Sequence, residues 1–296
     1  MSDGADNRPI GVFDSGLGGL TVVRELRRRL AGEDIVYLGD SARVPYGIKS
    51  LATVRRFARE DAGFLLRFDP KLIVVACNTA SAAAVETLER TLPVPVVDVI
   101  RPGAAAALTA TDGRIGVIGT QATIDSGAYQ GALGEADPSR AVLVAACPLL
   151  VPIVEEGRSE DDPIVLHVLG DYLRDMQRFR PGALILGCTH YPLLARAIGK
   201  LMGPAVALVS SAAAAAEEVR RRLDADGRTG GSGSLRCYTT DNARRFAELG
   251  RRFGGCDVGP VHSVGTDELE QPAPAAAGSA DRQPTGCGAE MREGSP

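Results

Sequence analysis

Residues 72–79 read Leu-Ile-Val-Val-Ala-Cys-Asn-Thr, and residues 183–190 read Ala-Leu-Ile-Leu-Gly-Cys-Thr-His. Each stretch is a short apolar run, typical of a buried strand, followed directly by a cysteine and polar side chains. A second pair of stretches, Ile-Gly-Val-Phe-Asp-Ser at 10–15 and Ile-Gly-Val-Ile-Gly-Thr at 115–120, repeats in the same order. The two pairs are separated by 111 and 105 residues, respectively, which indicates an internal duplication.

Short apolar runs alternate with helix-like stretches along most of the chain. The segments Leu20–Leu30, Thr53–Arg67 and Ser210–Leu223 have helical spacing and are rich in Ala, Arg, Leu and Glu. This alternation is typical of βαβ units and predicts an α/β fold with parallel sheets. The expected strands are Ile10–Phe13, Ile35–Leu38, Leu72–Ala76, Val94–Asp98, Ile115–Ile118, Ala141–Ala145, Ala183–Gly187 and Val206–Val209.

Ligands of open parallel sheets bind beyond the carboxyl ends of the strands. Asp14, Cys77, Thr120 and Cys188 all fall at such ends. Because the two halves of the chain end equivalent strands in similar chemistry, we expect two open parallel-sheet domains that enclose one cleft.

Composition excludes several classes of protein. The 296 residues are 45% hydrophobic, enough for a substantial core, and the net charge of −4 disfavours generic nucleic-acid binding. No apolar run reaches the roughly 18 residues of a membrane span, and the polar start lacks the apolar core of a signal peptide, so we expect a cytoplasmic protein. Six cysteines without a C-x-x-C pair predict free thiols and no metal site.

The two strand-end cysteines, Cys77 and Cys188, are the main candidates for chemistry. A single buried cysteine more often packs as a small hydrophobic residue. Two cysteines at equivalent positions of a repeat, each followed by polar residues, favour acid–base work on opposite faces of one carbon atom. A free thiol has a pKa near 8.5, so each needs help to ionise. His190, two residues after Cys188, is a candidate for that help.

The glycine-rich turn at residues 13–20, Phe-Asp-Ser-Gly-Leu-Gly-Gly-Leu, has two interpretations. It resembles a dinucleotide fingerprint, with Asp40 as the ribose-binding acid. However, the third glycine of that fingerprint falls at Thr21, and Asp14 would place a negative charge beside the pyrophosphate. A substrate ammonium group suits Asp14 better, while Ser15 and the following helix N-terminus can hold a carboxylate.

No organic cofactor is expected. A pyridoxal-phosphate enzyme needs a Schiff-base lysine, and the three lysines, Lys49, Lys71 and Lys200, all lie where solvent exposure is the default. A serine hydrolase would need a G-x-S-x-G turn, which is absent. General acid–base catalysis by side chains remains, with a two-domain solute-binding module or a regulator of a nucleic-acid enzyme as the rivals from another class.

Five motifs in order across residues 9–265 resemble the glutamate racemase family, within the aspartate/glutamate racemases. Aspartate and hydantoin racemases have a similar fold and cysteine pair, so glutamate as the substrate rests mainly on Asp14-Ser-Gly-Leu-Gly-Gly and Pro45-Tyr-Gly. The motifs are Asp14-Ser-Gly-x-Gly-Gly, Gly39-Asp-Ser-Ala-Arg-x-Pro-Tyr-Gly47, Ala76-Cys-Asn-Thr79, Gly119-Thr-x-Ala-Thr123 and Gly187-Cys-Thr-His-Tyr-Pro192.

The resemblance implies two pseudo-symmetric α/β domains with the active site in the cleft between them. The first would comprise residues 1–99 and 211–265 and the second residues 100–210. The composition of the end of the chain separately predicts a disordered tail at 266–296. The family also implies a homodimer. Two departures are a Ser210-Ser211 pair where the family commonly has Asp-Ser, and an added loop at Asp224–Ser234 whose composition predicts flexibility.

The resemblance also implies the chemistry: interconversion of L- and D-glutamate without metal or cofactor, supplying D-glutamate for peptidoglycan. Cys77 would act on D-glutamate and Cys188 on the L enantiomer. Glu155 looks like the acidic residue near the histidine, although Glu156 is an alternative. The implied catalytic residues are Cys77, Cys188, Asp14, His190 and Glu155, and the implied substrate-binding residues are Asp14, Ser15, Tyr46, Gly47, Asn78, Thr79, Thr189 and His190.

Overall fold

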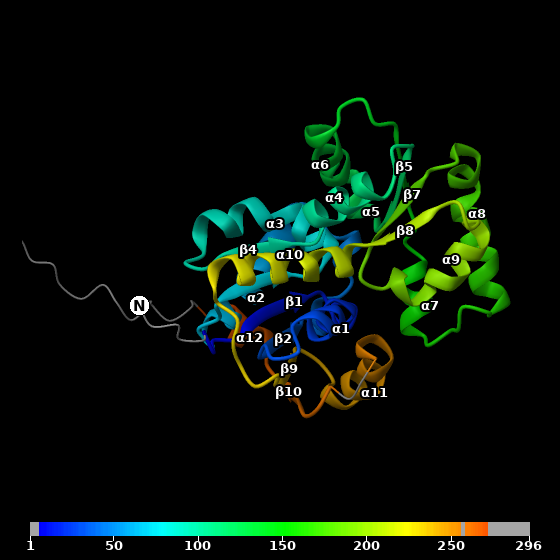
Figure 1. Cartoon of the computed structure of the whole chain (residues 1–296). Helices are drawn as coiled ribbons and strands as arrows, with labels where there is room; N and C mark the ends of the chain where they lie inside the picture. The colour runs from blue at the N-terminus through cyan, green and yellow to red at the C-terminus, as the bar shows by residue number, and fades with distance from the viewer. Residues whose placement is uncertain (1–5, 256–257, 272–296) are drawn as a thin grey trace, which may run out of the picture.

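The computed structural model describes residues 6–255 and 258–271, which form two parallel-sheet α/β domains (Figure 1). Sheet A has six strands in the order β10-β9-β2-β1-β3-β4, and sheet B has four in the order β6-β5-β7-β8. The expected fold class is therefore confirmed. The strands are β1 (Ile10–Asp14), β2 (Ile35–Gly39), β3 (Leu72–Val75), β4 (Val96–Asp98), β5 (Ile115–Gly119), β6 (Val142–Ala146), β7 (Ala183–Gly187), β8 (Ala207–Ser210), β9 (Leu235–Thr239) and β10 (Val261–Ser263).

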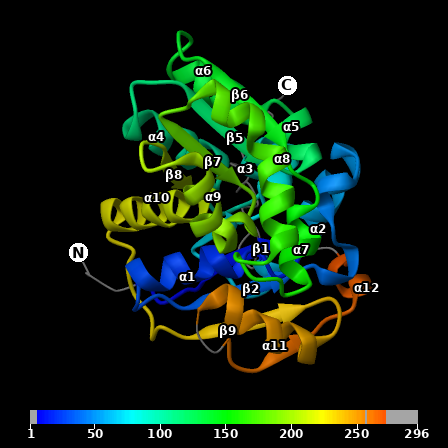
Figure 2. The same cartoon turned by 90° about the vertical axis from the view of Figure 1, so that its right-hand side faces the viewer.

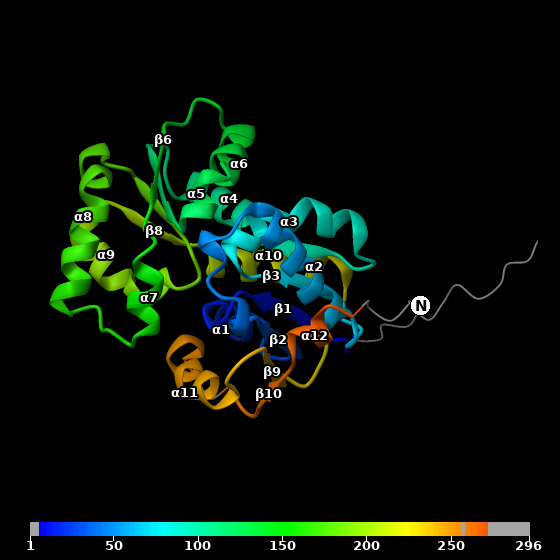
Figure 3. The same cartoon turned by 180° about the vertical axis from the view of Figure 1, so that it is seen from behind.

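Helices connect the strands and cover both faces of each sheet (Figures 1 and 3). The α-helices are α1 (Leu20–Arg29), α2 (Leu51–Leu66), α3 (Asn78–Thr91), α4 (Ile100–Ala110), α5 (Gln121–Asp125), α6 (Ala128–Ala136), α7 (Leu150–Glu155), α8 (Pro163–Phe179), α9 (Ala195–Met202), α10 (Ser211–Asp226), α11 (Ala243–Gly254) and α12 (Thr266–Leu269). Three short 3-10 helices, η1 (Ser41–Arg43), η2 (Tyr46–Ile48) and η3 (Tyr191–Leu194), lie in the connections.

The two sheets repeat one strand order. In sheet A, β1 lies between β2 and β3, and β4 lies on the outer side of β3. In sheet B, β5 lies between β6 and β7, and β8 lies on the outer side of β7. The register repeats too, since Ile10 pairs with Leu72 and Ile115 pairs with Ala183, at the first residue of each strand. The duplication inferred from sequence thus corresponds to one topology built twice.

Successive side chains of a strand are buried alternately on the two faces of its sheet, as expected for parallel strands covered by helices on both sides. In β3, Leu72 and Val74 join the core formed with α1 and α10, whereas Ile73 and Val75 join the core formed with α2 and α3. Because neighbouring strands in each sheet are parallel, the residues that follow them emerge at the same edge of the sheet.

Two helices lie where the two domains meet. α10 (yellow) follows the last strand of sheet B, contacts α4, and then runs along sheet A against α1 (Figure 1). α11 (orange) packs against α1 and lies below α7 of the other domain (Figure 2). The Ser210-Ser211 departure leaves the start of α10 intact, because the Ser210 hydroxyl accepts a hydrogen bond from Ala213 N–H as an N-cap.

Several expectations from sequence need correction. Strands β9 and β10 were not expected, and they extend sheet A beside β2. The loop at 224–234 was expected to be flexible, yet the Asp34 carboxylate accepts backbone hydrogen bonds from Ser232 and Ser234, and Glu33 accepts one from Gly230. These bonds hold the loop against the turn before β2.

Lys71 was expected at the surface but is fully buried. Its ammonium group lies 2.6 Å from Glu33 and donates to the carbonyls of Arg228 and Gly230 in the 224–234 loop. The segment placed at the start of the tail, 266–269, is instead helix α12, and it packs on α2 with Leu269 buried. The rest of that predicted tail, 272–296, lies outside the described residues.

Candidate active site

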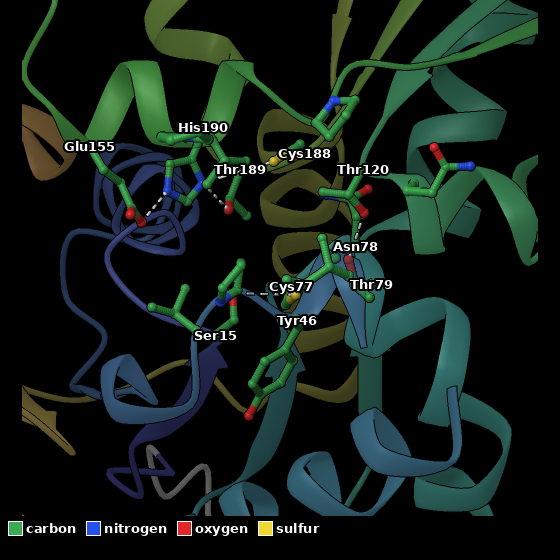
Figure 4. Close-up of a pocket in the computed structure, with 18 residues that line it drawn as sticks. Ser15, Tyr46, Cys77, Asn78, Thr79, Thr120, Glu155, Cys188, Thr189 and His190 are labelled. Carbon is green, nitrogen blue, oxygen red and sulfur yellow. Dashed lines mark hydrogen bonds and ion pairs between the residues drawn. The ribbon is translucent and has the colours of Figure 1, made fainter. Parts of the chain in front are cut away.

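A cavity of about 290 Å³ opens at the carboxyl ends of both sheets (Figure 4). Polar and sulfur-containing side chains come from both domains, and an apolar wall is formed largely by valines and prolines. The lining residues are Ser15, Val44, Pro45, Tyr46, Gly47, Ile48, Cys77, Asn78, Thr79, Thr120, Gln121, Pro148, Val151, Pro152, Glu155, Cys188, Thr189 and His190.

Cys77 follows β3 and caps the N-terminus of α3. Its Sγ accepts a hydrogen bond from Ala80 N–H at 3.5 Å and lies 3.8 Å from the Ser15 hydroxyl. Burial, followed by the nearby Asp14 carboxyl, raises the pKa of Cys77 to about 12, whereas the two hydrogen bonds oppose that rise. The thiol is therefore protonated and donates to the Ser15 hydroxyl, while the Ala80 N–H already points at the sulfur.

Cys188 follows β7 and faces the same cavity from the opposite side (Figure 4). Its Sγ lies 3.9 Å from His190 Nδ1, and His190 Nε2 lies 3.0 Å from Glu155 Oε1. Burial opposes charge on His190, but the contacts with Cys188 and Glu155 prevail and raise its pKa to about 10. The imidazole ring therefore lies between the Cys188 sulfur and the Glu155 carboxyl group and favours its protonated form. Of the two candidate acids, Glu155 makes this contact and Glu156 is exposed.

Asp14 lies behind the cavity wall. It is fully buried and does not line the cavity, so the expected direct contact with an ammonium group is not supported by its placement. Its carboxylate accepts hydrogen bonds from Gly16 N–H at 3.1 Å and from the Thr189 hydroxyl at 3.3 Å. Burial raises the pKa of Asp14, and the charge of His190 opposes this rise. The hydrogen bond between Asp14 and Thr189 therefore joins the last residue of β1 in one domain to the residue after Cys188 in the other.

The residues after Cys77 form hydrogen bonds with side chains of the second domain and with Ser211 at the start of α10. The Tyr129 hydroxyl on α6 donates to Asn78 Oδ1 at 2.7 Å, and the Asn78 amide donates to the Ser211 hydroxyl at 3.4 Å. The Thr79 hydroxyl lies 2.9 Å from that of Thr120 and 3.1 Å from that of Thr123. These contacts fix the orientation of Asn78 and Thr79 at the cavity wall.

Tyr46 and Gly47 lie on η2 and close another side of the cavity. The Tyr46 hydroxyl points away from both cysteines (Figure 4) and bonds the carboxyl groups of Asp40 and Asp61 instead. Gly47 lies so close to the second domain that a Cβ there would be 2.6 Å from Thr120 Cβ. Glycine is required at this position because the two domains approach so closely.

Sequence reasoning missed several residues that shape the site. Thr120 was expected at the ligand-binding edge of its sheet but was given no role, and Thr123, in the same Gly119–Thr123 motif, was not singled out. Tyr129 and Phe253, whose ring packs edge-on against His190 with centroids 5.3 Å apart, carry no local signal. Their contribution depends on tertiary contacts that helical periodicity does not reveal.

Fold and site together define a class of two-domain α/β proteins in which each domain brings a strand-end cysteine to one cavity. The model of the Asp/Glu/Hydantoin racemase family matches residues 10–219, and the chain belongs to that family. A glutamate racemase from Geobacter metallireducens is 46% identical over 262 residues, covering 87% of this chain and 96% of the relative. A solved glutamate racemase isoform from Bacillus anthracis has a TM-score of 0.84 at 41% identity, covering 88% of this chain and 98% of its own.

Two further solved relatives are described with ligands. The glutamate racemase of Francisella tularensis, in complex with D-glutamate, has a TM-score of 0.82 at 39% identity and covers 88% of this chain and 99% of its own. That of Escherichia coli, in complex with L-glutamate and the activator UDP-MurNAc-ala, has a TM-score of 0.71 at 26% identity, with coverage of 87% and 98%. No helix in the described parts of this chain has the length and apolarity to cross a bilayer.

Proposed function

We propose that this protein interconverts L- and D-glutamate, with Cys77 and Cys188 as the two proton donors and acceptors. The observation that carries the proposal is the placement of two thiols after equivalent strands of a duplicated topology, on opposite sides of one cavity. Relatives covering most of the chain are named glutamate racemases, which supports glutamate as the substrate.

In the proposed reaction, one thiolate takes the proton from Cα and the opposite thiol delivers a proton to the other face. The carbon–hydrogen bond on one face breaks, the electron pair delocalises towards the α-carboxylate, and a new carbon–hydrogen bond forms on the opposite face. One thiol and one thiolate exchange roles, so no oxidant, metal or organic cofactor is needed. Cys77 acts on D-glutamate and Cys188 on L-glutamate.

The surrounding polar groups stabilise charge as it develops. On the Cys188 side, His190 holds a positive charge next to the sulfur and Glu155 holds the imidazole in place. On the other side, the N-terminus of α3 and the Ser15 hydroxyl are placed to stabilise negative charge on the Cys77 sulfur. Fixed donors of this kind stabilise an anionic transition state without reorganisation. The substrate is held by Ser15, Tyr46, Gly47, Asn78, Thr79, Thr189 and His190, with Asp14 acting through Thr189.

The biological role follows as part of the same proposal. D-glutamate made in the cytoplasm supplies peptidoglycan synthesis, which fits the cell-wall precursor that activates the Escherichia coli relative. We place the domain boundaries at 99/100 and 210/211, supported by the packing of α4 on β7 and of α10 on α1. Homodimerisation remains a prediction.

The decisive experiment is incubation with L-glutamate in deuterium oxide without added cofactor. We expect D-glutamate to form with solvent deuterium at Cα, and the reaction to end at a racemic mixture from either enantiomer because enantiomers have equal free energy. A panel with aspartate and hydantoins distinguishes the other racemases of the family. If no tested compound exchanges its proton with solvent, the racemase proposal is wrong, and the rival interpretation as a binding module is favoured.

A further inference from the structure

A buried cluster of charged groups lies beneath the cavity wall formed by Val44–Ile48. Asp40 and Asp61 are fully buried, and Tyr46, which belongs to the wall, is 1% exposed. The Arg43 guanidinium donates to three carboxyl groups, those of Asp40, Glu60 and Asp61. One guanidinium thus faces three acids, two of which have no access to water.

The Tyr46 hydroxyl is in contact with two of these acids at once. Its oxygen lies 2.5 Å from Asp40 Oδ2 and 2.9 Å from Asp61 Oδ2. Burial, followed by the neighbouring Asp61 and Asp40, raises the pKa of Tyr46 well above its usual value, so the phenol is neutral and carries a single proton. A hydroxyl with one proton donates one hydrogen bond. The second contact requires a carboxyl group that donates to the phenol oxygen.

The hydrogen-bond partners determine which acid carries that proton. Asp40 accepts on both oxygens: Oδ1 from the Thr240 hydroxyl at 2.9 Å, and Oδ2 from Arg43 Nε at 2.6 Å as well as from Tyr46. Asp61 accepts from Arg43 on Oδ1 at 3.1 Å, which leaves Oδ2 free to hold a proton. The satisfied pattern runs from Asp61 Oδ2–H to the Tyr46 oxygen and from the Tyr46 hydroxyl to Asp40.

We propose that Asp61 is a neutral carboxylic acid at working pH, and that it is a positioning residue which holds Tyr46 and the 44–48 wall in the shape that binds substrate. Burial and the adjacent Asp40 both raise the pKa of Asp61 well above its usual range, against the effect of Arg43. The charged and titratable groups that face Asp61 are Asp40, Arg43, Tyr46 and Glu60. With Asp61 neutral, two carboxyl groups instead of three compete for the single positive charge of Arg43.

The position of the wall matters because the wall packs closely against the second domain. Val44, Pro45, Tyr46, Gly47 and Ile48 all line the cavity, and Gly47 is in close contact with Thr120. An ionised Asp61 would put two carboxylates on one phenol oxygen in a buried site, and Tyr46 would have to move away from one of them. Any such movement changes the wall that the substrate contacts.

The test combines infrared spectroscopy with kinetics on Asp61→Asn, Asp61→Ala and the control Asp171→Asn, which alters a half-exposed acid on α8. The infrared difference between wild type and Asp61→Asn at neutral pH is expected to show loss of one protonated-carboxyl C=O band that shifts in deuterium oxide. The control difference is expected to lack this band. If the band is missing, Asp61 is ionised and the proposal is overturned, whether or not Asp61→Ala folds.

The kinetic arm tests the positioning role and rests on the proposed function, whereas the infrared arm does not require activity. Asparagine reproduces the neutral acid, since its amide can donate to Tyr46 and its carbonyl can accept from Arg43. We therefore expect the KM for glutamate in Asp61→Asn to stay within about threefold of wild type, and that of Asp61→Ala to rise about tenfold with a smaller change in kcat. Equal KM increases in both variants, or an unchanged KM in Asp61→Ala, would contradict the positioning role.

Discussion

His190 Nε2 lies 3.0 Å from Glu155 Oε1, and this contact joins the imidazole that faces Cys188 to the end of α7. Burial lowers the pKa of His190, but the contacts with Cys188 and Glu155 prevail and raise it to about 10. Both ring nitrogens are thus engaged, one by the sulfur and one by the carboxylate. The protonation state of His190 therefore depends directly on Glu155.

Replacing Glu155 with Gln is expected to lower the pKa of His190, because a neutral amide no longer stabilises the imidazolium. On the proposed mechanism, the alkaline limb of the kcat/KM profile moves to lower pH, and kcat at neutral pH falls by about one to two orders of magnitude. Glu156→Gln, at the exposed neighbouring position, is the matched control. Identical pH profiles for Glu155→Gln and wild type would show that Glu155 does not contribute to catalysis.

The same contact predicts how stability depends on pH. The pKa of His190 is raised from 6.5 to about 10 in the folded protein. Between these two pH values, the folded state therefore binds more protons than the unfolded state. Its contribution to the free energy of unfolding is fully present below pH 6.5 and is lost as the pH rises through about 10. Urea unfolding between pH 6 and 10 should show a smaller decline for Glu155→Gln than for wild type.

Removal of either thiol is expected to abolish racemisation in both directions, since each direction needs one base and one acid. Cys77→Ala and Cys188→Ala should each lose at least about a thousandfold in kcat/KM, measured by circular dichroism of glutamate. Cys237→Ala removes a buried thiol of β9 outside the cavity and controls for a general effect of losing a cysteine. A fully active Cys188→Ala enzyme would exclude the two-base mechanism.

Arg252 on α11 is expected to support the site from the other domain. Its guanidinium donates to the carbonyls of Val154 and Arg158, at the end of the helix that carries Glu155. Arg252→Ala should reduce kcat several-fold by loosening the Glu155–His190 contact, and Arg252→Lys should restore part of it. Arg244→Ala, an exposed position on the same helix, should behave as wild type. An unaltered kcat and pH profile in Arg252→Ala would show that α7 holds its position without α11.

Lys71 is expected to matter for stability alone. Lys71→Met would leave the buried Glu33 carboxylate without its cation, and the free energy of unfolding in urea should fall by about 3–5 kcal/mol. The double variant with Glu33→Gln should lose less than the two single changes added together, because no unpaired charge remains. Lys200→Met, at an exposed position, should be neutral. The kcat of folded Lys71→Met should equal that of wild type, since Lys71 precedes β3 at the end of sheet A remote from the cavity.

Much of the fold could be predicted because its signals are local. The apolar runs 72–75 and 183–187 are long enough to identify buried strands, and the polar residues after them lie where parallel strands end. β9 was missed because Arg236 and Thr239 interrupt its apolar character, and β10 because three residues at a sheet edge carry almost no pattern. Lys71 was misplaced because its partners lie far away in sequence, at Glu33 and in the 224–234 loop.

The candidate site, like the fold, could be predicted from sequence only in part. Cys77, Cys188 and His190 follow strands, so their meeting at one cavity could be expected from topology. That Asp14 lies behind the wall, and that the Tyr46 hydroxyl faces Asp40 and Asp61, depends on side-chain direction, which a motif does not determine. Tyr129 and Phe253 reach the site from helices whose sequences show no sign of it.

The two copies of one topology surround their sulfur atoms differently: a helix N-terminus and Ser15 beside Cys77, a charged imidazole and Glu155 beside Cys188. On the proposed reaction, this asymmetry permits kcat and KM to differ between the two directions. The ratio kcat/KM cannot differ between the two directions, because an equilibrium constant of one requires it to be identical for L- and D-glutamate. Evolution can therefore tune either thiol to suit the prevailing enantiomer concentrations, but every change near one sulfur alters the catalytic efficiency of both directions by the same factor.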